Sequence, residues 1–281
     1  MTKARIDAHA HIWNVEQVAY DWPTPADAGL YRNIEPPELL PLMRDAGIAQ
    51  AVLVQAADHA EETDYLLRMA DAHDFVAGVV GWVPLDRAAE AGRRLETLAK
   101  HPRFKGVRHL IHCEADPDWI VRPEVVEGLR VLASFGLAFD VVAVFPNHLK
   151  HVPTLAERVP DLRLVLDHLA KPPIASGVGF DAWAAQLEAA AVAPNVYAKL
   201  SGLNTACDWT RWTAADWAPS VDVAFRAFGA DRLLFGSDWP VANLAGGYAR
   251  VWEATLQSLA GRTERDIEAV LGGTAAAVYR L

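Results

Sequence analysis

Apolar residues in this chain gather in eight short runs, and longer amphipathic stretches lie between them. In the first run, residues 5–13, apolar side chains alternate with Asp7, His9 and His11, a period of two that is typical of a β-strand. The later runs are mostly continuous in apolar residues, which is typical of strands buried on both faces. They cover residues 50–55, 75–83, 104–111, 137–144, 162–168, 195–200 and 232–238.

The stretches between these runs predict helices. Pro36 and Pro37 favour a helix start, Asp86 is a candidate N-cap, and Gly136 is a candidate C-cap. Beyond the helix that opens at Pro36, the expected helices cover residues 61–73, 86–100, 123–135, 148–159, 180–192, 219–228, 248–259 and 264–271. Long connections follow the first, fourth and seventh strands.

Regular alternation of strand and helix predicts an α/β protein with a parallel sheet that helices cover on both faces. Eight such strands favour closure into a (β/α)8 TIM barrel, whose usual length of about 250 residues fits this chain. No repeat, low-complexity tract or linker divides the sequence. We therefore expect a single domain over residues 1–281, with the long connections around one mouth.

Composition narrows the choice of function. The formal charge of −10 disfavours binding to nucleic acid or to an anionic membrane. Hydrophobic residues make up 52% of the chain, but no apolar run approaches the roughly 20 residues of a membrane span. Cys113 and Cys207 are too few for a disulfide framework. Residues 1–5 lead directly into the first strand, which favours a cytoplasmic protein without a signal peptide.

Side chains that can bind a metal or transfer a proton lie at the ends of three predicted strands. His9 and His11 are two residues apart in a strand, so both imidazoles point to one face, about 6–7 Å apart along the chain. By itself the pair fits a metal site, or two histidines that bond to backbone. His168 and Asp238 end two other strands, and the carboxyl ends of parallel strands in a barrel meet on one face.

At this point the chain resembles the amidohydrolase superfamily, and within it the sugar-lactone hydrolases that act on L-fuconolactone or L-rhamnonolactone. Five segments carry the resemblance in family order over nearly the whole length: residues 6–13, 106–109, 167–173, 197–203 and 235–240. The resemblance implies hydrolysis of a sugar-acid lactone to the open aldonic acid, as in L-fucose degradation. The partner would be a small lactone, and a homo-oligomer is compatible with it.

The resemblance also implies the site. His9, His11, His168 and Asp238 would hold one divalent metal, and three such ligands with water are typical of catalytic zinc. Asp238 is in addition the candidate general base, because a carboxylate beside a polarised water can accept its proton. Family members differ in whether they need a metal, so zinc is an expectation and not a consequence of the motif.

Further polar residues leave alternatives open. Glu114 follows the fourth strand and is a candidate general acid, a further ligand or a solvated loop charge. Lys199 lies inside a strand, where an internal ion pair is favoured over a carbamylated bridging ligand, which disfavours a binuclear site. Cys113 is interpreted as a plain small residue.

The substrate side rests on aromatic and hydrogen-bonding groups. Seven tryptophans fall at or beyond strand ends, where an indole either packs the barrel mouth or stacks on a sugar ring; most are expected to pack. The candidate substrate-binding residues are Trp13, Arg108, His112, His148, Asn204 and Trp239.

Two departures from the family pattern bear on the substrate. Ala10 stands where relatives usually carry Gln, and residues 145–148 lack the basic residue that commonly follows the fifth strand. The second departure favours a neutral, hydroxylated lactone over a dicarboxylated one. The alternatives are a metal-dependent decarboxylase, a 2-pyrone-4,6-dicarboxylate-type lactonase, and a non-enzymatic metal- or sugar-binding barrel.

Overall fold

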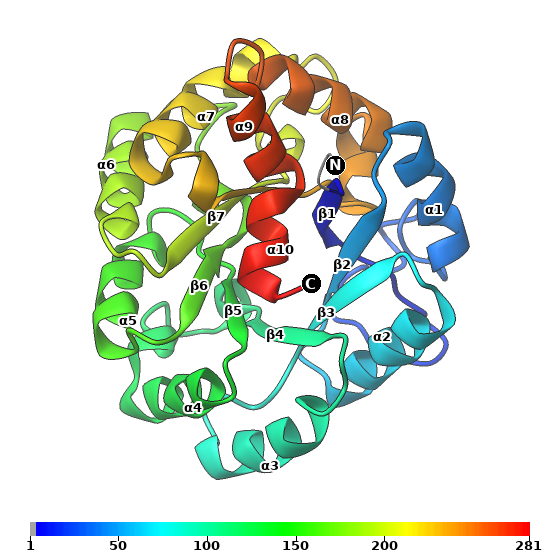
Figure 1. Ribbon diagram of the computed structural model, residues 1–281, viewed down its shortest axis with the longest axis vertical. Helices are drawn as coiled ribbons and strands as arrows, with labels where there is room; N and C mark the ends of the chain where they lie inside the picture. The colour runs from blue at the N-terminus through cyan, green and yellow to red at the C-terminus, as the bar shows by residue number, and fades with distance from the viewer. Residues whose placement is uncertain (1–3) are drawn as a thin grey trace.

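Eight parallel strands follow one another in chain order around a barrel in the computed structural model, which describes residues 4–281 (Figure 1). The strands are β1 (Ile6–Ala10), β2 (Gln50–Val54), β3 (Val76–Gly81), β4 (Phe104–His109), β5 (Ala138–Val141), β6 (Arg163–Leu166), β7 (Val196–Leu200) and β8 (Leu233–Phe235). The (β/α)8 barrel expected from the sequence is confirmed. Residues 1–3, which the expected domain and the expected leaderless start include, lie outside the described part.

Helices surround the barrel, one or more after each strand. They are α1 (Pro36–Asp45), α2 (Ala60–Ala72), α3 (Ala88–Leu98), α4 (Pro123–Ser134), α5 (Val152–Arg158), α6 (Phe180–Ala191), α7 (Ala214–Phe228), α8 (Gly247–Ser258), α9 (Glu264–Glu268) and α10 (Thr274–Tyr279). Among the described residues, no helix has the length and apolar character that a membrane span requires.

The barrel closes between β8 and β1 just beyond the end of β8. The Asp238 backbone N–H donates to the His9 carbonyl at 2.8 Å, and the His11 N–H donates to the Trp239 carbonyl at 2.7 Å. Ala10 and Trp239 pair as an isolated parallel bridge. The seam that closes the barrel therefore runs through the residues expected to carry the chemistry.

The strands bury both faces, as their apolar runs predicted. Ile6, Val52, Val80, Val165 and Leu234 point into the barrel, and their outward neighbours pack against the surrounding helices. The inward cluster also takes in Ala275, Val278 and Tyr279 from α10. Figure 1 shows α10, in red, lying across the centre of the ring. It covers the end of the barrel at which the strands begin, so the opposite end is left for a site.

Several element boundaries differ from the sequence expectation. Helix α7 begins at Ala214 and contains Pro219, because Thr213 and Asp216 form a capping box that starts the helix earlier. The helix expected over 148–159 is reduced to α5, which follows a short 3-10 turn. Strand β6 ends at Leu166 and strand β8 at Phe235, before the expected ends at residues 168 and 238. The backbone turns into the left-handed region just beyond each strand. Helix α10 was not predicted, because six mostly small residues show little periodicity.

Candidate functional site

Strand β1 and the turn after β8 deliver three of the four expected site residues. His9 is buried within β1, and His11 follows one residue after the strand ends. Asp238 has a left-handed backbone with φ of 58°, which is uncommon for a residue with a side chain. This conformation lets its N–H close the barrel seam while its carboxylate faces the histidines. A strained backbone of this kind persists where the surrounding structure enforces it, often at functional sites.

His168 enters the site on a left-handed turn. Four consecutive residues, 168–171, have φ between 50° and 58°, although none is glycine. Side chains normally avoid this region because Cβ approaches the carbonyl oxygen. Gly202 makes the arrangement feasible, because a Cβ there would lie 2.6 Å from His168 Nδ1 and 2.8 Å from Asp238 Oδ2. Gly202 itself has φ of 57°, so glycine is required there for two reasons.

The four side chains lie together at the mouth of the barrel. Asp238 Oδ1 is 3.5 Å from His11 Nε2, 3.7 Å from His9 Nε2 and 3.9 Å from His168 Nε2. The Nε2 atoms of His9 and His11 are 3.1 Å apart. All four residues are buried. One carboxylate oxygen therefore faces three imidazole nitrogens.

The local environment keeps the imidazoles of His9 and His168 neutral and the carboxylate of Asp238 charged. Burial lowers the pKa of His168 to about 3, and burial together with the nearby Lys199 lowers the pKa of His9. Burial would raise the pKa of Asp238, but His168, His11 and His9 outweigh it and hold this pKa well below its usual range. At neutral pH the site thus offers the neutral imidazoles of His9 and His168 beside one carboxylate anion.

Hydrogen bonds fix part of the proton arrangement. Nδ1 of His11 lies 2.7 Å from the Val54 carbonyl, which only accepts, so Nδ1 carries the proton and Nε2 keeps its lone pair. Nε2 of His9 then meets that lone pair across 3.1 Å. This contact is favourable when His9 Nε2 carries a proton, or when a cation lies between the two nitrogens.

A buried charge network lies directly beneath His9. Lys199 Nζ is 3.0 Å from His9 Nδ1 and 3.0 Å from Asp167 Oδ1, and it also forms an ion pair with Asp140. Arg108 Nε is 2.8 Å from Asp167 Oδ2. The charges of two acidic and two basic side chains thus balance inside the barrel. Each of these side chains comes from one of the strands β4 to β7, or from the residue just after it. Lys199 forms the internal ion pair that the sequence favoured.

The residues present fit a single divalent metal better than two. Ligand atoms of His9, His168 and Asp238 lie within 4.8 Å of one another, and the cluster contains imidazoles with lone pairs facing a carboxylate. Zinc bonds of about 2.0–2.2 Å separate ligand atoms by roughly 3.3–3.6 Å in tetrahedral geometry. Asp238 Oδ1 lies 3.5–3.9 Å from the three imidazole nitrogens. His9, Asp140 and Asp167 also lie within 4.8 Å of one another, but the Lys199 ammonium ion-pairs with both of these acids.

A cavity of about 390 Å³ opens beside the cluster. His11, His168 and Asp238 line it, together with two of the expected substrate-binding residues, Arg108 and His112. This volume lies within the range of small-molecule sites. The cavity is also lined by residues that were not expected there from the sequence, among them Asp21, Trp22, Asp58, His59 and Lys171.

Four other expected substrate-binding residues make contacts within the fold. The buried Trp13 indole donates to the Leu30 carbonyl, and the Asn204 amide donates to the Ala242 and Ala245 carbonyls. Nδ1 of His148 accepts from the Val144 N–H at 3.3 Å, and Trp239 is buried at the barrel seam. None of these four is among the described residues that line the cavity.

Glu114 also lies away from the cluster. Its Oε1 is 2.8 Å from Nε2 of His109, and it does not belong to the described cavity lining. Cys113 does line the cavity and is exposed. The tryptophans behave mainly as packing residues: Trp119, Trp212 and Trp217 are buried, whereas Trp22, from the connection after β1, reaches the cavity.

The missed residues carried little sequence signal. Asp58 and Trp22 lie on connections without a recognisable motif, and their position depends on how those connections fold over the mouth. Lys171 and Asp167 lie near His168, within the segment 167–173 that contributes to the family resemblance. Their clustering with charged residues of other strands could not be read from spacing along the chain.

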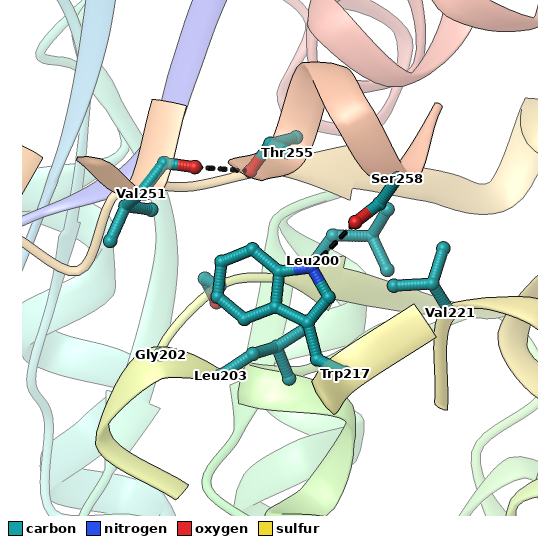
Figure 2. A pocket seen from close by; sticks show the side chains of 9 residues that line it. Leu200, Gly202, Leu203, Trp217, Val221, Val251, Thr255 and Ser258 are labelled. Atoms are coloured by element: carbon teal, nitrogen blue, oxygen red, sulfur yellow. Dashed lines mark hydrogen bonds between the residues drawn. The ribbon is translucent and has the colours of Figure 1, made fainter. Parts of the chain in front are cut away.

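A second, much smaller space lies behind β7, between α7 and α8. Figure 2 shows the Trp217 indole lining it, with Nε1 donating a hydrogen bond to the Ser258 hydroxyl. Its volume of about 10 Å³ admits at most about one water molecule, so a lactone does not fit. Ser201 lines this space and contacts His168 Nδ1 at 2.8 Å. The space thus belongs to the packing that supports the site.

The fold and cluster define a barrel enzyme with a histidine- and aspartate-lined site at its carboxyl-terminal mouth. The chain belongs to the amidohydrolase family, whose model, described as Amidohydrolase, matches residues 6–281. An L-fucono-1,5-lactonase of Burkholderia ambifaria is 40% identical over 99% of this chain and 96% of the relative. An L-fucono-1,5-lactonase of Burkholderia multivorans is 35% identical over 100% of this chain and 97% of the relative.

A solved structure agrees with the family assignment. The crystal structure of an amidohydrolase from Burkholderia multivorans with bound zinc superposes with a TM-score of 0.92 at 34% identity, covering 99% of this chain and all of that one. The full-length similarity is thus to hydrolases of cyclic esters, and it extends over the whole barrel.

Proposed function

We propose that this enzyme hydrolyses a sugar-acid lactone resembling L-fuconolactone to the open aldonic acid. The observation that carries the proposal is the position of Asp238, a buried carboxylate that faces three imidazoles and opens onto a cavity of sugar size. Relatives named L-fucono-1,5-lactonase over the full length support the choice of a cyclic ester and a role in L-fucose degradation.

Asp238 acts as the base in this reaction. A water beside its carboxylate attacks the lactone carbonyl, and its proton passes to Asp238 as the new C–O bond forms. When the bond between the acyl carbon and the ring oxygen breaks, the same proton passes to that oxygen, which would otherwise leave as a poor alkoxide. One carboxylate thereby serves both steps, and the products are one acid with one free hydroxyl.

In this proposal the Arg108 guanidinium binds the polar end of the substrate. Its guanidinium is held by Asp167 and by a hydrogen bond from Nη1 to the Gln55 carbonyl at 2.6 Å, while the side chain lines the cavity. A donor fixed in this way loses little entropy on binding and can stabilise negative charge that develops on the carbonyl oxygen.

His9, His11, His168 and Asp238 would hold zinc. Bound there, zinc supplies Lewis-acid polarisation of the carbonyl and a lowered pKa for a nearby water. The buried imidazoles suit this ligand role, and the lowered pKa of His9 and His168 favours it because a metal competes with protons for their nitrogens. Ser201 and the Val54 carbonyl orient the His168 and His11 rings through their other nitrogen.

A lactone panel tests the proposal. Acid release from L-fuconolactone, D-galactonolactone and a pyrone dicarboxylate is followed with a pH indicator in one buffer, with and without chelator. We expect turnover of the neutral sugar lactones and a lower kcat/KM for the dicarboxylate. A preference for the dicarboxylate would favour the pyrone-type lactonase, and release of carbon dioxide from a carboxylated substrate would favour the decarboxylase.

A further inference from the structure

We propose that Asp58 is the residue that selects hydroxylated lactones, by accepting hydrogen bonds from ring hydroxyls of the bound substrate. The inference rests on the proposed lactonase function and deepens it. Asp58 follows β2 and lines the same cavity as His11, His168 and Asp238. Its side chain remains 25% exposed, unlike the buried cluster, so its carboxylate is accessible to a ligand.

The Asp58 carboxylate is held in place from two strands. The Gln55 amide donates to Oδ1 at 2.9 Å, and the Leu110 N–H lies 3.1 Å from Oδ1 and 3.2 Å from Oδ2. Gln55 is itself fixed, because its Nε2 also donates to the Arg108 carbonyl at 3.0 Å. A carboxylate has about four acceptor positions, and these donors leave at least one of them for a hydroxyl.

His109 supports Asp58 from behind. The Trp82 indole N–H can only donate, and it lies 3.1 Å from His109 Nδ1, so Nδ1 accepts and the ring proton is on Nε2. That proton faces Glu114 at 2.8 Å and the Asp58 Oδ2 atom at 3.5 Å. His109 also stacks on Trp119 with ring centroids 4.1 Å apart, which prevents it from swinging away.

The chemistry around Asp58 fits a neutral sugar ring. Trp22 in the same cavity offers an aromatic surface for the C–H faces of a ring, and Asp58 offers a charged acceptor for its hydroxyls. Asp21 also lines this cavity, which adds a second negative charge. The cations of this lining are Arg108, which is paired with Asp167, and Lys171, on the turn that carries His168. A lactone with a carboxylate facing Asp58 would meet like charge across a partly desolvated gap.

The test compares two neutral lactones and one anionic lactone in the Asp58→Asn variant of the full chain. The substrates are L-fuconolactone, unsubstituted δ-valerolactone and a ring-carboxylated lactone. We expect kcat/KM for L-fuconolactone to fall roughly 10- to 100-fold, mainly through KM, since a hydrogen bond to a charged group is lost. The value for δ-valerolactone should change less than about twofold, and that for the carboxylated lactone should rise.

Asp86→Asn is the matched control, because Asp86 lies on the connection after β3, is exposed and does not line the cavity. It removes the same charge and should leave all three substrates unchanged. If Asp58→Asn does not fold, Asp58→Ala repeats the comparison, since water can then satisfy Leu110 and Gln55.

The outcomes separate this inference from the proposed function. Equal losses on L-fuconolactone and δ-valerolactone would mean that Asp58 only supports the cavity, and would overturn the specificity role. A carboxylated lactone that also loses activity would overturn the charge argument. Absence of any lactone turnover by the unmodified enzyme would instead overturn the proposed function itself.

Discussion

The ammonium group of Lys199 lies 3.0 Å from Nδ1 of His9, at the centre of a cluster without solvent access. Asp167 lies within 3.2 Å of the same nitrogen. In the neutral His9 ring, Nδ1 can accept a hydrogen bond from Lys199 or donate one to Asp167. Nε2 carries the ring proton in the first case and a lone pair in the second. With the proton on Nε2, His9 directs an N–H toward His11 Nε2. With the proton on Nδ1, the Nε2 lone pair of His9 is available to a cation.

Lys199→Met tests the energetic role of this network. The substitution leaves Asp140 and Asp167 buried with one compensating cation fewer, and removal of one partner from a buried pair costs about 3–5 kcal/mol. We expect the free energy of unfolding in urea to fall by that amount. Lys150→Met is the control, because the exposed Lys150–Asp118 pair contributes at most about 1 kcal/mol. Equal effects of the two substitutions would contradict the role of Lys199.

Gly202→Ala tests the packing of the site. The added Cβ meets His168 and Asp238, so kcat/KM for L-fuconolactone should fall on the order of 100-fold through misplacement of these groups. Gly177→Ala is matched in backbone conformation, with φ of 65°, but has open space around it. Both variants place a Cβ in the left-handed region, at a similar cost of roughly 1–2 kcal/mol. Only Gly202→Ala should lose activity beyond its loss of stability.

Asp238→Asn tests the base. The amide keeps the shape of the side chain but removes its basicity, so kcat should fall roughly 10²–10⁴-fold. The dissociation constant of the substrate, measured by calorimetry under conditions of slow turnover, should change little. Asp231→Asn removes an exposed carboxylate near the start of β8 and should be neutral. An Asp238→Asn enzyme with unimpaired kcat would exclude this carboxylate as the base.

Metal content is a separate prediction. Protein purified without added metal should hold about one zinc per chain by elemental analysis, and chelator should lower the Tm because a bound metal stabilises the folded state. His168→Ala should lose the metal. His148→Ala should retain it, because the His148 ring lies against the Val144 backbone outside the cluster. Metal-free protein with full activity would leave the histidines as hydrogen-bonding groups only.

Glu62 should make stability depend on pH. Its buried carboxyl accepts from the Ala56 and Ala57 N–H groups of the cavity wall, and burial raises its pKa to about 8 from an ordinary value of 4.5. The folded chain then binds the proton more tightly than the unfolded chain. Its stabilising contribution is complete below about pH 4.5 and is lost as pH rises through 8.

The comparison of Tm between pH 5 and pH 9 checks this sign. The Tm of the unmodified enzyme should fall over this range more than that of Glu62→Gln, whose amide does not titrate. Glu61→Gln is the control on the same helical turn, because Glu61 is exposed and its substitution should leave the pH profile unchanged. Identical profiles for Glu62→Gln and the unmodified enzyme would exclude Glu62 as the cause.

The chain pattern by itself determined the barrel and the four clustered side chains. Strands buried on both faces are apolar throughout, and helices alternate with them, so the local pattern contains the architecture. In a parallel barrel the carboxyl ends of the strands lie on one face. The positions of His9, His11, His168 and Asp238 in the sequence therefore predicted that these side chains would lie near one another. The apolar pattern did not determine where α7 begins, because a capping box sets its start. It did not predict α10 either, because α10 is held by packing against the end of the barrel.

Only the tertiary structure decided which polar groups line the cavity. Trp13 and Asn204 matched the expected chemistry, yet they bond to backbone carbonyls away from the cavity. Asp58 and Trp22 line it instead, because the connections after β1 and β2 fold over the mouth. The conformation of a connection depends on contacts with distant strands, such as the bond between Asp58 and Leu110, 52 residues apart. Such contacts leave no periodic trace in the sequence.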